Sequence, residues 1–380
     1  MLIMGKAFHY DTGEENMIKR TLFCLALAAG GSSQAAPQGE KKPPPIMGAI
    51  RWDAWHGSDS QVGLTVEKTL APKHWHHRLP FFGKVLDENT VEIRGNTQSI
   101  VDQEIEYAYR GGLDYWAFVV YPKDHALSYG LKLYLSSEKR HKIRFCLDLQ
   151  GGWEGRGGLL SWPERINRYQ KLFREPTYQT VLGNRPLVYL YTVEGLVGEG
   201  RFETWEDART AFDALRSACK EEQLGDPYIV AQGWSPDTLK RQARQLGLDA
   251  IGAYASTAGE RASPYSNLSA HTERGWDALR KTGVPVVPLA TSGWDMRPRV
   301  ETPVPWVKGG DIQQYYEAPT PEELASHLQN ALAWCRENPQ VAEAQAVLIY
   351  AWNEFDEGGW LCPTISEGTA RLDALSKVLE

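Results

Sequence analysis

The chain has 380 residues, of which 42% are hydrophobic and 11% aromatic, and its formal net charge is −7. This length is ample for one large hydrophobic core, and the mild acidity argues against nucleic acid or an anionic membrane surface as a partner. The sequence contains 14 tryptophans. Because the apolar face of an indole ring suits stacking on the C–H face of a sugar, this composition favours a carbohydrate ligand, although core packing also uses tryptophan.

The first residues have the pattern of an export signal. Met17-Ile18-Lys19-Arg20 is a short basic region, and Thr21 to Ala29 is an apolar core too short to span a bilayer. Ser33-Gln34-Ala35 then offers the small residues that signal peptidase requires. We therefore expect translation to begin at Met17 and cleavage to occur near Ala35 or Ala36.

This pattern predicts the organisation of the whole chain. Residues 1–36 are interpreted as an upstream extension plus a secretory signal peptide, 37–47 as a proline-rich linker, and 48–380 as one catalytic barrel. The mature protein is then periplasmic or secreted from a bacterium, with no membrane attachment after cleavage. The alternative is a frayed N-terminal helix of a cytosolic enzyme.

Apolar, β-branched runs recur along the rest of the chain and predict buried strands. These runs are Gly48–Trp55, Leu113–Tyr121, Ile143–Leu149, Pro186–Tyr191, Tyr228–Ala231, Ala250–Tyr254, Val286–Ala290 and Val347–Ala351. The helical stretches between them include Thr97–Arg110, Trp205–Glu222, Thr238–Leu246 and Pro321–Glu337. The last of these has a strong start signal, since Thr320 precedes a proline and two acids.

Eight strands that alternate with helices predict an α/β fold, a single (β/α)8 barrel of the TIM type. A doubly wound sheet is the alternative, but no glycine-rich phosphate or dinucleotide loop follows the first strand. Between the first strand and the first helix lies a long loop with His74, His76 and His77. Adjacent histidines point in different directions and no acid or cysteine has ligand spacing, so neither a metal nor a cofactor is predicted.

Four cysteines remain after the predicted processing: Cys146, Cys219, Cys335 and Cys362. None has C-x-x-C spacing, so neither a zinc knuckle nor a thioredoxin-like site is indicated. A disulfide is possible in an oxidising compartment, but the sequence does not pair these residues.

The active site of a (β/α)8 barrel lies at the carboxyl ends of its strands. The residues expected there form a ring of aromatic and hydrogen-bonding side chains: Asp53, Trp55, Tyr121, Asp148, Gln150, Tyr191, Glu194, Gln232, Trp234, Tyr254, Trp294, Asp295, Arg297, Arg299, Asn353 and Trp360. Such a ring suits a neutral polyhydroxylated ligand, so the predicted partner is an oligo- or polysaccharide. The protein itself is expected to be a monomer.

Several members of this ring have an alternative structural interpretation. Asp53 and Asp148 could equally cap the helices that follow them, and the tyrosines could equally pack at the barrel rim. The two arginines could pair with carboxylates to hold a loop. Glu194 follows the fourth strand and is a rival candidate for a catalytic acid.

The stretch after the last strand carries the strongest chemical signal. Glu354, Asp356 and Glu357 fall within four positions, between aromatic residues. Like charges repel and apolar neighbours desolvate them, which raises at least one pKa and suits a general acid that works near neutrality. Glu357, beside Gly358 and Gly359, is expected to be the carboxylate with the raised pKa. The alternative is a solvated acidic turn flanked by core aromatics.

Two segments resemble a known family. Trp352-Asn353-Glu354-Phe355-Asp356-Glu357-Gly358 is similar to the W-N-E-[aromatic]-x-E-G segment of the family 99 glycoside hydrolases, the endo-acting α-mannosidases, and of their WbsX-like bacterial relatives. Gly293-Trp294-Asp295-Met296-Arg297-Pro298-Arg299 is similar to their G-W-D-N-[ST]-P-R segment, with Met296 in place of asparagine. The family's aromatic Y-Y-P-x-[FW]-H start is replaced by Arg51-Trp52-Asp53-Ala54-Trp55-His56, which leaves the substrate less defined than the chemistry.

The resemblance implies hydrolysis of an α-mannoside-type linkage with retention of anomeric configuration. Carried over, Glu354 would deprotonate the sugar's own 2-hydroxyl, which attacks the anomeric carbon, and Glu357 would act as general acid and then base. Asp356 is expected to point away and serve the structure. Two alternatives stay open: a WbsX-like glycosyltransferase, although the chain has no D-x-D motif, and a non-catalytic glycan-binding barrel.

Overall fold

The computed structural model describes residues 44–57 and 59–379. The predicted extension, the signal peptide and most of the predicted linker lie outside these residues. Within the described ranges, no helix is both long enough and apolar enough to cross a membrane.

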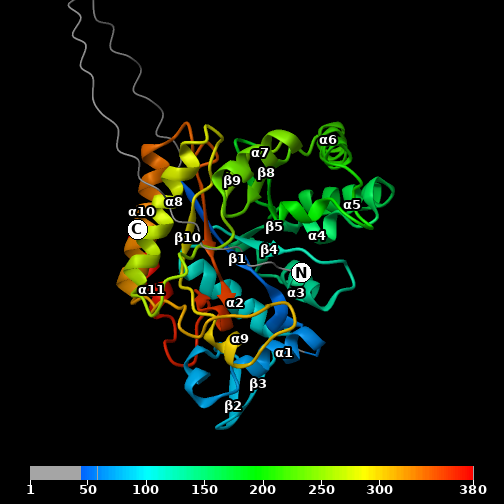
Figure 1. Cartoon of the computed structure of the whole chain (residues 1–380). Coiled ribbons are helices and arrows are strands. Elements are labelled where there is room, and N and C mark those ends of the chain that lie inside the picture. Colours follow the sequence, from blue (N-terminus) through cyan, green and yellow to red (C-terminus); the bar gives the residue numbers. More distant parts are fainter. Residues whose placement is uncertain (1–43, 58, 380) are drawn as a thin grey trace, which may run out of the picture.

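Parallel strands form a nearly closed barrel, which confirms the predicted fold class (Figure 1). Their order around the barrel is β10-β11-β1-β4-β5-β7-β8-β9, and a single parallel bridge between Ile251 and Val286 links the two ends of this order. The strands are β1 (Ile46–Arg51), β4 (Tyr115–Val119), β5 (Arg144–Gln150), β7 (Arg185–Tyr191), β8 (Tyr228–Gln232), β9 (Ala250–Gly252), β10 (Leu289–Thr291) and β11 (Ala346–Tyr350). The short strand β6 (Thr180–Val181) pairs antiparallel with β7.

The barrel interior is filled by side chains, as expected for strands buried on both faces. The hydroxyl groups of Tyr115 and Tyr189 meet at 2.7 Å, and Tyr115 also donates to the carbonyl of Val347 at 3.0 Å. Gly48 makes room for this arrangement, because a Cβ there would lie 2.2 Å from the Tyr115 ring.

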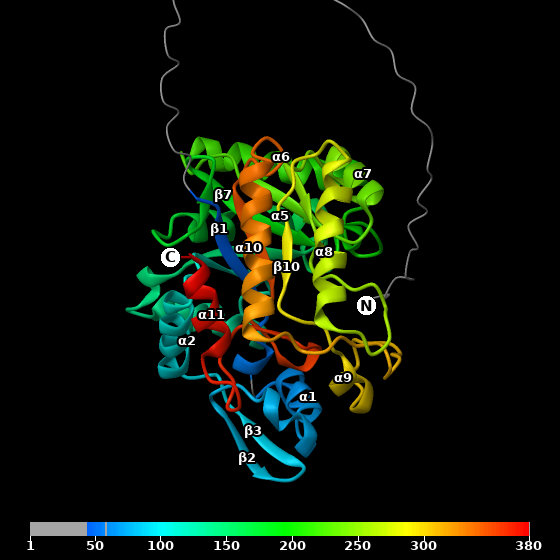
Figure 2. The same cartoon turned by 90° about the vertical axis from the view of Figure 1, so that its left-hand side faces the viewer.

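Helices cover the outside of the barrel, and Figure 2 shows α8 and α10 side by side in front of β10. The helices are α1 (Gln61–Thr69), α2 (Gln98–Arg110), α3 (Tyr129–Ser136), α4 (Gly151–Glu154), α5 (Gly158–Phe173), α6 (Trp205–Glu221), α7 (Pro236–Leu246), α8 (Tyr265–Arg280), α9 (Arg297–Glu301), α10 (Pro321–Glu337) and α11 (Ala370–Leu379). Helix α10 begins as predicted. Thr320 accepts a hydrogen bond from the backbone of Glu323, whose side chain accepts one from the backbone of Thr320.

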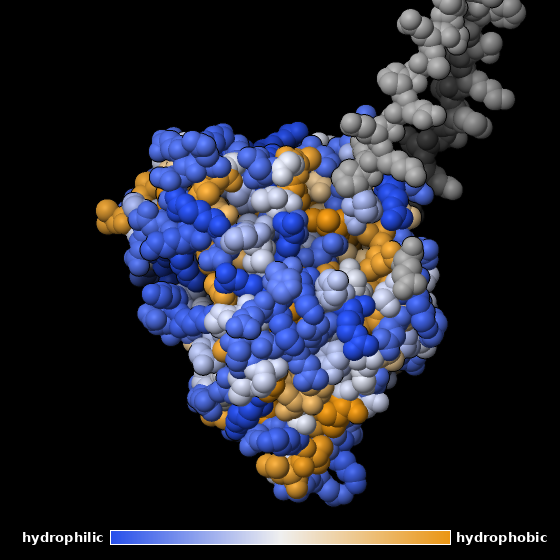
Figure 3. Space-filling view, turned by 180° about the vertical axis from the view of Figure 1, so that it is seen from behind, coloured by the Kyte–Doolittle hydropathy of each residue, from blue (hydrophilic) through white to orange (hydrophobic). Residues whose placement is uncertain are grey.

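The predicted long loop contains elements that were not expected from the sequence, and helix α1 (Gln61–Thr69) is the first of them. Within the predicted long loop, β2 (Gly83–Asp87) and β3 (Thr90–Ile93) pair as an antiparallel hairpin. The surface in Figure 3 is mainly hydrophilic, and apolar side chains gather at the end of the molecule that holds this hairpin. Val85 and Leu86 of β2 are exposed there.

Candidate active site

A short hairpin after the last barrel strand carries the candidate carboxylates. Strand β12 (Asn353–Glu354) pairs antiparallel with β13 (Gly359–Trp360), and the 3-10 turn η6 (Phe355–Glu357) joins them. Gly358 closes the turn with a φ of 81°, and a Cβ there would lie 2.4 Å from the backbone nitrogen of Asp295. Only glycine fits both conditions, so this glycine brings Glu357 against the loop that follows β10.

Arg299 of α9 lies at the centre of the acidic residues. Its guanidinium group binds both carboxylate oxygens of Asp356, at 2.7 and 2.9 Å. The same group donates to Oε1 of Glu357 and lies 3.3 Å from Oε2 of Glu354. The ring of Trp52 lies 5.2 Å from it on another side. One buried cation therefore holds three carboxyl groups together.

The two glutamates have different surroundings. Burial, and then the nearby charge of Glu357, raise the pKa of Glu354 well above its usual range, although Arg299 opposes this shift. Glu357 is partly exposed, and it accepts hydrogen bonds from Arg299 and from the hydroxyl of Tyr350. The sequence analysis expected a raised pKa within this acidic stretch, and Glu354 has one. Burial is the reason, and the sequence does not show which of the two side chains is buried.

Asp356 does not point away from the two glutamates, as the sequence analysis expected, but faces the same arginine. Its side chain is fully buried, and it accepts a hydrogen bond from Thr69 of α1 at 3.2 Å in addition to those from Arg299. It therefore orients the guanidinium group that contacts the two glutamates.

Aromatic side chains surround the acidic centre in two groups. The first aromatic group comprises Tyr191, Trp234, Tyr254, Trp294 and Tyr350. Tyr191 and Tyr254 are stacked at 3.9 Å, and Tyr254 contacts Tyr350 at 5.8 Å. Trp234, at the outer end, is 52% exposed and could receive a ligand ring.

The second aromatic group comprises Trp52, Tyr121, His125 and Trp153. The indole of Trp52 donates to the Tyr121 hydroxyl at 2.8 Å, and the Tyr121 ring stacks on His125 at 4.9 Å. Burial raises the pKa of Tyr121 to about 12, with a further contribution from Glu354. Glu354 is near enough to Tyr121 in this group and to Tyr254 in the first group to raise the pKa of both hydroxyls.

Four predicted ligand contacts are turned into the protein. Asn353 clasps the end of β1: its amide exchanges hydrogen bonds with the backbone of Trp52, at 2.9 and 2.8 Å. Trp55 donates to the carbonyl of Asn353, and Trp360 lies buried under Arg371. These positions, with that of Asp53, do not support ligand binding. The first strand also ends earlier than predicted, because the 3-10 turn η1 (Asp53–His56) follows Arg51.

Other predicted residues lie at varying distances from the centre. Asp295 is buried in ion pairs with Arg297 and Arg78.

Asp148 is fully buried, which raises its pKa well above the usual range, and the amide of Gln232 faces it at 2.9 Å. The side-chain amide of Gln150 donates to the carbonyl of Val120 at 3.3 Å, and it also forms a hydrogen bond with the side chain of Tyr121. Glu194, the rival acid, is exposed on the rim beside Tyr191. Among the predicted site carboxylates in the part of the chain that the structure describes, Glu354 and Glu357 are the two that pair with Arg299, together with the buried Asp356.

Asp53 belongs to a buried ion network beneath the site. Arg51 donates to Asp53 and to Glu104, each at 2.8 Å, and lies over the ring of Trp116. Glu104 also accepts from the indole of Trp352 at 3.0 Å, directly before the clasp residue Asn353. The network therefore supports the hairpin that carries Glu354 and Glu357.

This network predicts a defined dependence of stability on pH. Arg51 and His56 outweigh burial and lower the pKa of Glu104 from 4.5 to about 2. A lowered folded-state pKa contributes stability above the unfolded pKa and loses it as pH falls through the folded pKa. Relative to Glu104→Gln, the wild type should lose on the order of 3 kcal/mol between about pH 4.5 and pH 2. Chemical denaturation at several pH values measures this difference, and a constant difference would contradict the assignment.

The histidine cluster of the 3-10 turn η2 (Lys73–Arg78) does not converge. His74 contacts Glu301 at 2.8 Å, His76 the carbonyl of Ala71, and His77 the carbonyl of His74. Over the residues that the structure describes, no group of three or more histidine, cysteine or acidic side chains could hold a metal ion. The four cysteines of the described part are buried free thiols.

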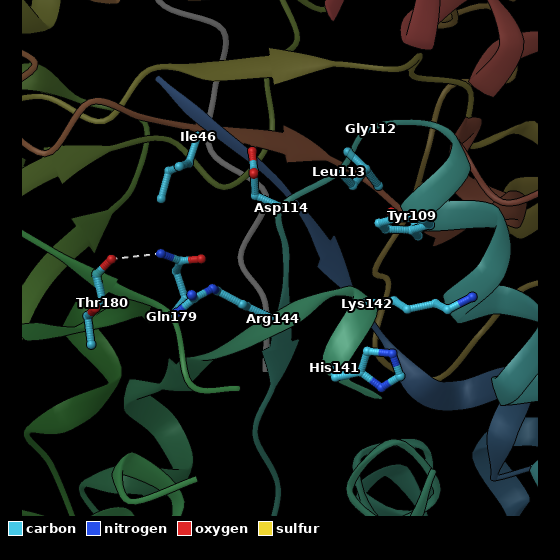
Figure 4. A pocket seen from close by; sticks show the side chains of 10 residues that line it. All are labelled: Ile46, Tyr109, Gly112, Leu113, Asp114, His141, Lys142, Arg144, Gln179 and Thr180. Carbon is cyan, nitrogen blue, oxygen red and sulfur yellow. Dashed lines mark hydrogen bonds between the residues drawn. The ribbon is translucent and has the colours of Figure 1, made fainter. Parts of the chain in front are cut away.

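A hollow of about 500 Å³ lies at the other end of the barrel. Figure 4 shows its lining, which includes Ile46, Asp114 and Arg144 at the amino ends of β1, β4 and β5. The side chain of Asp114 accepts a hydrogen bond there from the backbone nitrogen of Met47, at 2.7 Å. The hollow shares no residue with the acidic centre, so it is separate from the candidate active site.

The sequence analysis missed three contributors to the site. Tyr350 was counted as part of an apolar strand, and His125 and Trp153 follow strands without any motif. For Tyr350 the sequence did contain a signal. It is the last residue of a barrel strand, and the carboxyl ends of the strands line the active site of such a barrel. Arg299 was identified, and its pairing with the carboxylates was one of the stated alternatives.

The fold and the site define this chain as a (β/α)8 barrel with a pair of glutamates at the carboxyl rim of its strands. The model of the family described as Glycosyltransferase WbsX matches residues 159–375, which is more than half of the chain, and the chain belongs to this family. No curated protein sequence matches it.

Two solved structures of the GH99 endo-α-mannosidase from Bacteroides thetaiotaomicron are similar in fold. The complex with bis-tris propane has a TM-score of 0.56 at 13% identity, covering 87% of this chain and 94% of that one. The second structure has a TM-score of 0.54 at 11% identity, with coverage of 87% and 95%. These identities show a common barrel fold alone.

Proposed function

We propose that this protein is a glycoside hydrolase that cleaves an α-linked glycan, of the α-mannoside type, with retention of anomeric configuration. The observation that carries the proposal is the meeting of Glu354 and Glu357 on Arg299, near aromatic side chains of both groups at the barrel rim. Two carboxyl groups with separate surroundings are the minimum for glycoside cleavage. The shared fold with a GH99 endo-α-mannosidase supports the same reaction class.

The proposed reaction has two steps. In the first, Glu354 takes the proton of the sugar's 2-hydroxyl, whose oxygen attacks the anomeric carbon while Glu357 protonates the departing glycosidic oxygen. A 1,2-anhydro sugar and the shortened glycan result. In the second, Glu357 takes a proton from water, the water oxygen attacks the anomeric carbon, and Glu354 returns a proton to the 2-oxygen. Two displacements at one carbon retain its configuration.

The proposed reaction needs one proton on the pair. The raised pKa of Glu354 favours a proton on Glu354 in the free enzyme. The first step needs it on Glu357 instead. The resting and reactive forms therefore differ in which carboxyl group is protonated and not in the number of protons, so glycan binding must favour the second arrangement.

The description of the family favours a second candidate, a glycosyltransferase. A transferase of the metal-dependent type needs a site for a nucleotide diphosphate and its cation, generally with a D-x-D motif, which this sequence lacks. Sugar nucleotides are made in the cytosol, and the export signal predicted at Met17 favours a location outside it. We therefore propose export and hydrolysis together.

A glycan screen tests the proposal. The purified protein is offered a panel of α-linked oligo- and polysaccharides, with nucleotide sugars as a parallel panel, and the first product is followed by NMR before its anomers equilibrate. Cleavage with release of the retained anomer is the expected result. An inverted product would exclude the 2-hydroxyl mechanism and make Glu194 or Asp295 the next candidates.

Two other outcomes identify the alternatives. Transfer from a nucleotide sugar would replace the hydrolase proposal with the glycosyltransferase. Tight binding of a glycan without cleavage, equal in wild type and Glu357→Gln, would identify a glycan-binding barrel.

A further inference from the structure

Tyr350, the last residue of β11, contacts a carboxylate that the proposed reaction uses. Its hydroxyl donates to Oε2 of Glu357, while Arg299 occupies Oε1. The Tyr350 ring is fully buried and packs against Tyr254 at 5.8 Å and Trp294 at 5.6 Å. These contacts fix the direction in which the hydroxyl points.

The hydrogen bonds to the two glutamates are unequal. Both oxygens of Glu357 accept from donors, whereas Glu354 has one longer contact with Arg299, at 3.3 Å. Burial, followed by the charge of Glu357, raises the pKa of Tyr350 well above its usual range. Tyr350 therefore keeps its proton and acts only as a donor. A donor of this kind stabilises the ionised form of the carboxyl group it contacts.

We infer that Tyr350 is a positioning residue whose hydroxyl orients Glu357 and favours its carboxylate form over its protonated form, which favours Glu354 as the site of a proton shared by the pair. The inference rests on the proposed function, in which Glu354 and Glu357 carry out the reaction. In that reaction Tyr350 favours the resting arrangement, from which glycan binding must move the proton.

Charged and titratable groups from several elements lie near Glu357. They are Arg299 from α9, Glu354 from β12, Asp356 from η6, Tyr191 from β7 and Tyr254 from the segment after β9. Of these, Arg299 donates to Glu357, and it binds the other carboxylate oxygen from the one that Tyr350 contacts.

The variant Tyr350→Phe tests the inference through the pH profile of kcat/KM. In the free enzyme the acidic limb reports the gain of a second proton, which goes to Glu357, and the basic limb reports the loss of the proton from Glu354. Without the Tyr350 hydroxyl, ionised Glu357 is less stable. The acidic limb should therefore move up by about one pH unit, while the basic limb stays in place.

A matched control is Tyr189→Phe, which removes a buried hydroxyl whose partner is Tyr115 and not a carboxylate. Both limbs of this variant should coincide with those of the wild type. A purely structural role for Tyr350 would lower kcat without moving either limb. That result, or an equal shift in Tyr189→Phe, would overturn the inference.

A second measurement needs no substrate. Glutamate is labelled with ¹³C at the carboxyl carbon, the signal of Glu357 is assigned by comparison with Glu357→Gln, and its titration is followed by NMR. Its midpoint should be about one pH unit higher in Tyr350→Phe than in the wild type. An unchanged midpoint contradicts the inference even if the proposed hydrolysis is correct, and failure of the glycan screen leaves this test valid.

Discussion

Replacing Glu357 by glutamine is expected to lower kcat about 10²- to 10⁴-fold on the natural glycan, because the departing oxygen no longer receives a proton. Glutamine has the same shape and still accepts from the Tyr350 hydroxyl through its carbonyl oxygen, so the fold should be retained. Steady-state kinetics on the glycan found by the screen measures the loss, and circular dichroism checks the fold.

The leaving group separates the two proposed roles. An aryl glycoside of the same sugar, whose phenolate leaves without a proton, should be cleaved by Glu357→Gln at a rate much closer to that of the wild type in the first step. Glu354→Gln should lose activity on both substrates, because the 2-hydroxyl is then not deprotonated. Equal losses on both substrates in Glu357→Gln would contradict its role as an acid.

Glu343→Gln is the matched control for this substitution. Glu343 also accepts a hydrogen bond from a buried tyrosine, Tyr228 at 3.1 Å, but at the opposite end of the barrel. It should have the kinetics of the wild type. A large loss of activity in this variant would show that a glutamate-to-glutamine change acts through stability.

Replacing Arg299 by methionine is expected to lower the free energy of unfolding by about 3–5 kcal/mol, because the buried Glu354 and Asp356 and the partly exposed Glu357 lose their shared counter-ion. The Arg299 side chain is 3% exposed and pairs with Glu354, Asp356 and Glu357. Chemical denaturation near neutral pH measures the loss, and turnover should be lost as well.

The pH dependence of the Arg299→Met effect has a definite sign. Without the cation, the folded variant binds more protons at its carboxyl groups than the unfolded chain does, so its stability falls as pH rises. The destabilisation should be smaller near pH 5 than near pH 7. Arg209→Met is the control, since its pair with Asp213 is exposed and worth about 0.2–1 kcal/mol at most. A loss for Arg299→Met no larger than this would contradict the central place of Arg299.

The barrel was predictable because its signal is carried by whole strands. A parallel strand buried on both faces reads as a continuous apolar run, and β11 (Ala346–Tyr350) and β4 (Tyr115–Val119) have this pattern over their full length. The hairpin β2–β3 has no such run: β2 is exposed along nearly its whole length, so its pairing depends on the fold and not on hydrophobic alternation.

The sequence predicted which residues lie near the site, but not the direction in which each side chain points. A residue that follows a strand can point into the site or back into the protein, and the sequence does not distinguish the two. Glu354 and Asn353 are neighbours, yet one faces the acidic centre and the other clasps Trp52. Asp53 was expected at the rim and pairs instead with Arg51. Arg51 is buried, and a buried guanidinium group is strongly destabilising unless a carboxylate pairs with it.

The position of β11 between β1 and β10 has a consequence for synthesis of the protein on the ribosome. A chain that has emerged only as far as α10 has unpaired edges on both of these strands, and it lacks the hairpin with Glu354 and Glu357. Exposed strand edges are templates for association with other chains. Closure of the barrel and completion of the acidic centre are therefore one late event, and a prematurely terminated product is expected to lack the acidic centre and to be prone to aggregation.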